Sequence, residues 1–274
     1  MASASRRILV WVVLNKKNRM GKDAHATWVV WMLPKALIVN FWSVLYEDRS
    51  RAERLVRMQA TLGKLLAEAG IDAAAETLAQ ICAALTTEPA ADAADSAAGG
   101  SACPPLVQRV MEVSRKAGLP IPSQVAAAFA RKASQAAVNF APPSQFPDDF
   151  KMLKKLAEHY ALVLVGNTTV PTGAGMREVL DGDHLLQFFR ATVFSDEFGV
   201  NLPGAGLYEA ALGFLRYEAR DVWVIAGDSA RDLPAARSLK LQTILVQRGA
   251  TPKAEASVET VPSLQALVER LKAV

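Results

Sequence analysis

The sequence predicts an α/β fold, a doubly wound parallel sheet with a helical cap inserted after the first strand. Short apolar runs typical of buried strands alternate with helical segments from residue 148 to residue 274. Such alternation predicts right-handed β-α-β units and therefore a parallel sheet. One further apolar run, residues 36–41, is separated from the others by a long helical stretch, which indicates an insertion. The length of 274 residues suits one large domain or two modest ones.

The insertion is predicted over residues 47–147. Leucine and methionine recur at spacings of three and four from Glu47 to about Leu85, which predicts helix. Residues 86–102 are rich in Ala, Ser, Gly and Asp and are expected to form a mobile loop. Helical pattern returns over residues 106–140, and three prolines within residues 141–147 close the insertion.

The core is predicted to comprise residues 36–46 and 148–274. Its apolar runs share the length and the Val, Ile and Leu content of strands buried on both faces. After the first strand, the predicted strands are residues 161–165, 191–194, 221–226 and 242–246. The predicted helices are residues 148–159, 174–180, 206–214, 233–239 and 263–271.

Composition excludes several classes of protein. The chain is 51% hydrophobic and 21% charged, so it can bury a sizeable core. No apolar run reaches the roughly 18 residues of a spanning helix, so a transmembrane protein is not expected. Two cysteines and three scattered histidines exclude a disulfide framework and disfavour a transition-metal centre.

Positive charge is concentrated in an N-terminal extension, residues 1–35. This segment has seven basic side chains and one acidic side chain, a net charge of +6, whereas the other 239 residues sum to −2. Such asymmetry indicates targeting, or contact with nucleic acid or an anionic surface. Residues 1–22 lack acidic side chains, as organellar transit peptides do, but the apolar run Ile8–Leu14 favours a strand. We expect a retained extension and a mitochondrial location, or otherwise a cytoplasmic one.

The extension carries a candidate interface. Trp11, Trp28 and Trp31 lie in or beside two apolar segments, Ile8–Leu14 and Trp28–Leu33. Tryptophans next to cations are typical of interface anchors, and the cations here are Arg6, Arg7, Lys16 and Lys17. The expected partners are other protein subunits, with an RNA or lipid surface as an alternative. A different interpretation is that these segments pack on the chain's own body.

Candidate site residues follow the strands, because ligands bind at the carboxyl ends of strands in such sheets. The sequence from Val39 to Leu45 reads Val-Asn-Phe-Trp-Ser-Val-Leu, and Val165–Thr169 reads Val-Gly-Asn-Thr-Thr. The third strand leads into Val193–Val200, and the fourth into Gly227–Asp232, Gly-Asp-Ser-Ala-Arg-Asp. Over roughly residues 36–249 these motifs resemble the haloacid dehalogenase-like (HAD) superfamily, in the subgroup with a helical cap. The resemblance implies a Rossmannoid fold.

The resemblance also shows which reactive groups of the family are replaced. The first motif aligns with an apolar-D-x-D-G-T-L pattern, so Asn40 stands in place of the aspartate nucleophile and Trp42 in place of the general acid and base. Gly166 stands where the family offers a phosphate-binding hydroxyl, and Leu202 where it offers a lysine. A neutral amide is a poor nucleophile, and an indole cannot shuttle the proton.

The fourth motif alone persists, as Asp228 and Asp232, which in the family hold Mg²⁺. With Asn40 in the first motif we expect no bound metal, no cofactor and no small-molecule substrate. The sequence therefore predicts a pseudoenzyme, a structural or interaction subunit of a large assembly such as an organellar ribosome or a respiratory complex. The alternative is a Mg²⁺-dependent hydrolase of a small phosphate ester. A ligand sensor ranks last, because Trp42 would fill the pocket.

Overall fold

A six-stranded parallel sheet forms the centre of the computed structural model, which describes residues 7–10, 29–87, 101–140, 142–146, 149–227, 229–248 and 258–272. The strand order is β10-β9-β8-β3-β6-β7, and all neighbouring strands run parallel. The strands are β3 (Ala36–Asn40), β6 (Ala161–Gly166), β7 (Ala191–Phe194), β8 (Val222–Ala226), β9 (Gln242–Val246) and β10 (Glu259–Val261). The predicted α/β class is confirmed.

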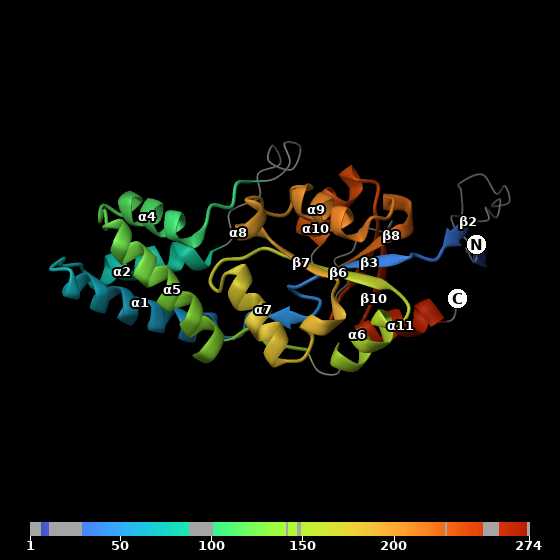
Figure 1. The fold of residues 1–274 in the computed structure, drawn as a ribbon, viewed down its shortest axis with the longest axis horizontal. Coiled ribbons are helices and arrows are strands. Elements are labelled where there is room, and N and C mark those ends of the chain that lie inside the picture. Colours follow the sequence, from blue (N-terminus) through green and yellow to red (C-terminus); the bar gives the residue numbers. More distant parts are fainter. Residues whose placement is uncertain are drawn as a thin grey trace, which may run out of the picture.

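Helices cover both faces of this sheet (Figure 1). One face packs on α6 (Asp149–Ala157), α7 (Gly173–Gly182) and α11 (Leu264–Lys272), and the other on α9 (Gly206–Leu215) and α10 (Ser229–Ser238). Strand β3 contributes Leu37 and Val39 to the first hydrophobic cluster, and Ala36 and Ile38 to the second. Because alternate residues of a strand point to opposite faces, a wholly apolar run is what a central strand requires.

Four helices of the described residues form the cap at one end of the molecule (Figure 1). They are α1 (Arg51–Glu68), α2 (Ala75–Thr86), α4 (Leu106–Lys116) and α5 (Ser123–Phe140), packed around a separate apolar cluster. The chain passes between core and cap through β4 (Tyr46–Glu47) and β5 (Ser144–Gln145), which pair antiparallel. The continuous helical pattern predicted from Glu47 is in fact two helices, because the chain turns at Gly70 with a φ of 71°.

The N-terminal extension contributes a separate two-stranded antiparallel sheet, β1 (Arg7–Val10) with β2 (Val29–Met32). This sheet lies at the opposite end of the long axis from the cap (Figure 1). The side chains of Arg7 and Trp31 are not described, and the other predicted interface residues lie outside the described part of the chain, namely Arg6, Trp11, Lys16, Lys17 and Trp28. Most of the predicted mobile loop, residues 88–100, also lies outside it.

Two further details differ from the sequence-based expectation. The sheet has a sixth strand, β10, which was missed because it has three residues, two of them polar. Helix α10 begins at Ser229, earlier than the predicted start at residue 233, which had been set by the first apolar side chain. Within the described residues, no helix combines the length and the apolar character that crossing a membrane requires.

Ser43, in the turn after β3, is exposed and has a φ of 64°. A left-handed backbone conformation destabilises the folded state by roughly 1–2 kcal/mol when the residue is not glycine. Replacing that residue by glycine removes this strain, but it also stabilises the unfolded state by about 0.4–1 kcal/mol because glycine has more backbone entropy. We therefore expect Ser43→Gly to raise the free energy of unfolding by about 0.5–1 kcal/mol, measured by urea denaturation. The matched variant Ser123→Gly, at the start of α5, should lower it instead. A destabilising Ser43→Gly would contradict this reading of the turn.

Candidate functional site

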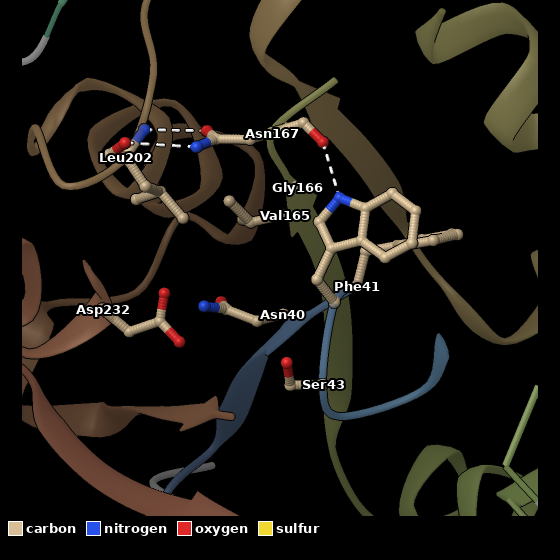
Figure 2. Close-up of a pocket in the computed structure, with 9 residues that line it drawn as sticks. Asn40, Phe41, Ser43, Val165, Gly166, Asn167, Leu202 and Asp232 are labelled. Atoms are coloured by element: carbon tan, nitrogen blue, oxygen red, sulfur yellow. Dashed lines mark hydrogen bonds between the residues drawn. The ribbon is translucent and has the colours of Figure 1, made fainter. Parts of the chain in front are cut away.

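A small pocket lies where β3 ends between its two neighbours, β6 and β8 (Figure 2). Parallel strands on either side of β3 leave by crossovers to opposite faces, so this is the switch point at which α/β proteins bind ligands. The cavity has a volume of about 60 Å³, whereas ligand sites usually measure roughly 300–1,000 Å³. It is lined by Asn40, Phe41, Trp42, Ser43, Val165, Gly166, Asn167, Leu202 and Asp232.

Asn40, the last residue of β3, is 3% exposed and its side chain is bonded within the protein. Its amide nitrogen donates to the Tyr208 hydroxyl at 3.0 Å, and that hydroxyl donates back to the amide oxygen at 3.2 Å. Tyr208 lies on α9 and is fully buried. Burial, followed by the negative charge of Asp232, raises the pKa of Tyr208 well above its ordinary value. The phenol therefore stays neutral and remains a fixed partner for the amide.

Trp42 forms one wall of the pocket. Its indole N–H donates to the backbone carbonyl of Asn167 at 2.8 Å. Its ring meets the Phe41 ring edge-on, with 4.9 Å between the ring centroids. The hydrogen bond and the ring contact hold the indole in place at the edge of the pocket.

Asn167, whose carbonyl accepts the Trp42 indole N–H, joins two loops beside the pocket (Figure 2). The Asn167 amide nitrogen donates to the Leu202 carbonyl at 3.1 Å, and the Leu202 N–H donates to the amide oxygen at 2.8 Å. Gly166 adds a steric limit, because a Cβ there would lie 2.9 Å from the Phe41 Cβ. A hydroxyl-bearing side chain at position 166 would therefore require Phe41 to move.

Asp232, in the first turns of α10, is 3% exposed and faces Asn40 across the pocket (Figure 2). It accepts a hydrogen bond from the Gly227 N–H at 3.2 Å. Asp228, the other acidic residue of the fourth motif, lies outside the described residues. The one described carboxylate of this motif is therefore used to hold the turn after β8.

The structure brings five of the predicted site residues to one pocket: Asn40, Trp42, Gly166, Leu202 and Asp232. Two important residues were not assigned a role from the sequence. Nothing in the sequence around Tyr208 indicates its role, because its contact with Asn40 depends on how α9 crosses β3. Asn167 was part of a quoted motif, and an amide directly after a strand is a signal that could have been used.

Comparisons with known proteins agree with this fold. Residues 200–273 match the family model described as HAD-hydrolase-like. The structure is similar to 2-haloacid dehalogenase from Pseudomonas syringae pv. Tomato DC3000, with a TM-score of 0.59 and 17% identity over 88% of this chain and 99% of that one. It is also similar to a HAD phosphatase from Thermococcus onnurineus, with a TM-score of 0.54 and 14% identity over 86% and 97% of the two chains.

A third similar structure is the putative HAD-hydrolase YfnB from Bacillus subtilis bound to magnesium, described as revealing interdomain movement. Its TM-score is 0.53, with 12% identity over 87% of this chain and 99% of that one. No curated protein matches the chain in sequence.

Sheet order, crossover helices and an inserted cap define a Rossmannoid α/β protein with a lid-like second unit. The particular form of that fold is the HAD-like one, and the resemblance predicted from the strand-end motifs is confirmed. At these levels of identity the likeness establishes the fold, and a fold by itself does not establish a reaction.

Proposed function

We propose that this chain is a non-catalytic protein of HAD-like fold that serves as a structural or interaction subunit of a larger assembly. The observation that carries the proposal is Asn40, which stands at the end of the central strand and exchanges hydrogen bonds with Tyr208. The family's chemistry starts with attack by a carboxylate at this position. An amide lacks that negative charge, and here both ends of the amide already have a partner.

The other reactive positions support the same conclusion. Trp42 offers one N–H donor, already bonded to a carbonyl, where an acid and base is needed. Leu202 is 5% exposed and brings no charge to a phosphate. Gly166 has no room for a hydroxyl-bearing side chain. Each of these roles is worth orders of magnitude in rate, so their joint loss is incompatible with efficient phosphoryl transfer.

The described residues do not form a Mg²⁺ site, although the fold family implies one. Mg²⁺ is usually held by one or two carboxylates with near-octahedral oxygen ligands. Asp232 already accepts the Gly227 N–H, and the Asn40 oxygen accepts the Tyr208 hydroxyl. Among the residues with described positions, no group of three or more His, Cys, Asp or Glu side chains could hold a metal.

The second candidate is a Mg²⁺-dependent hydrolase of a small phosphate ester, and the comparisons favour it. The similar structures include a dehalogenase, a phosphatase and a magnesium-bound hydrolase, and the matched region 200–273 includes the fourth motif. Turnover of p-nitrophenyl phosphate by the purified chain, with and without Mg²⁺, separates the two candidates. We expect no turnover above that of Asn40→Ala. Mg²⁺-dependent turnover that Asn40→Ala abolishes would establish the hydrolase.

Asn40→Asp alone is expected to leave the protein without phosphatase activity. The new carboxylate would supply a nucleophile, but Trp42 would still lack a transferable proton and Leu202 would still leave the phosphate charge unmatched. The measurement is hydrolysis of p-nitrophenyl phosphate with Mg²⁺, with Asn40→Ala as the matched control that removes the side chain. Measurable turnover by Asn40→Asp would mean that the remaining site is competent and that the motif assignment is wrong.

We further propose that the N-terminal extension attaches the protein to other protein subunits, in a mitochondrial assembly such as a ribosome or a respiratory complex. Support comes from the sequence, which gives residues 1–35 a net charge of +6 and three tryptophans. Further support is that β1 and β2 pair with each other, outside the six-stranded sheet. An RNA or lipid surface is the competing partner, and the deletion and substitution variants of the Discussion distinguish these cases.

A further inference from the structure

Among the described residues, hydrogen bonds join the cap and the core at three separate places, apart from the two chain crossings. The first is a main-chain pairing between the segment that enters α4 and the loop that follows α8 (Ser195–Phe198). The Cys103 N–H donates to the Gly199 carbonyl and the Asn201 N–H donates to the Ser101 carbonyl, both at 2.9 Å.

The second attachment is Arg109, which α4 projects onto the loop after β6. Its guanidinium donates to the carbonyl of Thr168 at 3.4 Å and to that of Thr169. The side chain is half-buried, and burial is the main influence on its pKa, which is lowered. A half-buried cation bonded to two carbonyls cannot leave them without losing charged hydrogen bonds.

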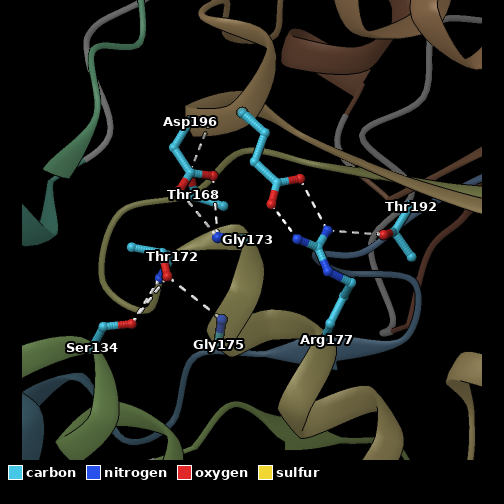
Figure 3. Close-up of polar contacts among 9 residues, drawn as sticks. Ser134, Thr168, Thr172, Gly173, Gly175, Arg177, Thr192 and Asp196 are labelled. Atoms are coloured by element: carbon cyan, nitrogen blue, oxygen red, sulfur yellow. Dashed lines mark hydrogen bonds and ion pairs between the residues drawn. The ribbon is translucent and has the colours of Figure 1, made fainter. Parts of the chain in front are cut away.

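The third attachment joins the cap helix α5 to the start of the core helix α7 (Figure 3). Ser134 Oγ accepts the Thr172 N–H at 3.2 Å and lies 3.1 Å from the Thr172 hydroxyl. The two helices meet closely at Gly175, where a Cβ would lie 3.0 Å from a methyl carbon of Val138. Glycine at this position permits the approach of α5 to α7.

Hydrogen bonds within the core hold the loops to which the cap is attached (Figure 3). Thr168 donates its N–H to the Ser195 hydroxyl at 2.8 Å and its own hydroxyl to Asp196 at 2.9 Å. The Asp196 carboxylate also accepts the Gly173 N–H, at 3.1 Å to each oxygen. Ser195 is fully buried. The loops that the cap contacts are therefore held from the sheet side.

We propose that the cap of this protein is fixed to the core and does not open as a lid. Main-chain pairing, the half-buried Arg109 and a helix–helix contact would all have to break together for the cap to swing away. The inference rests on the proposed function in one respect, because a protein that admits no substrate needs no opening. Its test uses no activity measurement, so the two proposals can fail separately.

The test is native-state hydrogen exchange of the full chain, read at the N–H groups of Cys103, Thr172 and Asn201, which donate across the interface. We expect their exchange rates to be within about tenfold of those of the β3 amides. If the cap does not open separately, exchange at both sets of amides requires opening of the whole structure. A lid open in one molecule of a hundred would limit their protection to about 100-fold. Protection at or below that level, with β3 still protected, would overturn the proposal.

Variants sharpen the test. Arg109→Ala should speed exchange at these three amides by roughly ten- to a hundredfold. The β3 amides should speed up by no more than that, because the lost contact also lowers the free energy of opening the whole structure. The matched variant Arg115→Ala, on the exposed side of α4, should have no effect. Unchanged exchange in Arg109→Ala would contradict the assigned contact. If Arg109→Ala does not fold, Ser134→Ala provides the same comparison at Thr172. Phosphatase activity with a protected interface would refute the proposed function alone.

Discussion

Gly227→Ala is expected to destabilise the protein by about 3 kcal/mol, the largest single-residue effect that we predict. Gly227 follows β8 and packs against the turn after β3. A Cβ at this position would lie 2.7 Å from the Ser43 carbonyl carbon and 3.0 Å from its Cα, and would also collide with the Ser43 Cβ. These are backbone atoms beside a buried sheet, so they cannot move away as a flexible side chain could.

Urea denaturation measures this effect, and Gly213→Ala is the matched control. Gly213 lies in α9 with no atom near its would-be Cβ, so alanine there should stabilise the protein by about 0.5–1 kcal/mol. Combining Gly227→Ala with Ser43→Gly should recover part of the loss, because the Cβ collision disappears and the backbone contacts remain. A Gly227→Ala protein as stable as the parent would show that the two turns are not packed as described.

If the proposed assembly exists, deletion of residues 1–34 is expected to abolish association with it while the α/β body stays folded. The body has its own clusters on both faces of the sheet and a separate cap cluster. Lys35, which forms an ion pair with Asp221 at 2.9 Å, remains after the truncation. Interface tryptophans typically contribute about 2 kcal/mol or more each, so losing three should eliminate binding.

A pull-down from the native source and a melting curve of the truncated protein check this prediction. Unfolding of the truncated protein would show that the extension belongs to the core. Normal assembly of the truncated protein would show that the interface lies outside residues 1–34. Two full-length variants separate the partner classes: Trp11, Trp28 and Trp31 changed to Ser, and Arg6, Arg7, Lys16 and Lys17 changed to Gln. Loss of binding only in the charge variant, with a steep salt dependence, would favour RNA or lipid over protein.

The sheet could be predicted from the sequence because its strands lie buried on both faces. The run Ala36-Leu37-Ile38-Val39 needs apolar groups at every position, and this pattern is clear even over four residues. Strand β10 could not be predicted, because an edge strand of three residues needs neither length nor continuous hydrophobicity. The break between α1 and α2 was missed because the apolar spacing continues on both sides of it.

The site could be predicted in position but not in detail. Residues directly after parallel strands must meet at one edge of a sheet, so Asn40, Gly166 and Asp232 could be assigned to one pocket from chain order alone. The pairing of Asn40 with Tyr208 could not, because it depends on the depth at which α9 packs on β3. The three cap attachments could not be predicted from the sequence either, since residues such as Arg109 and Thr169 are not part of any periodic pattern.

The position of β3 at the centre of the sheet imposes an order on synthesis of the chain. Ala36 pairs with Ala161 on one side and with Val222 on the other, so this strand leaves the ribosome long before either neighbour exists. At roughly 5–20 residues per second the wait lasts on the order of ten seconds. During that interval a bare apolar segment is flanked by the whole cap, whose helices can fold locally. We therefore expect the cap, which is complete before β6 is made, to be the first folded surface that can shield the segment around which the sheet is later built.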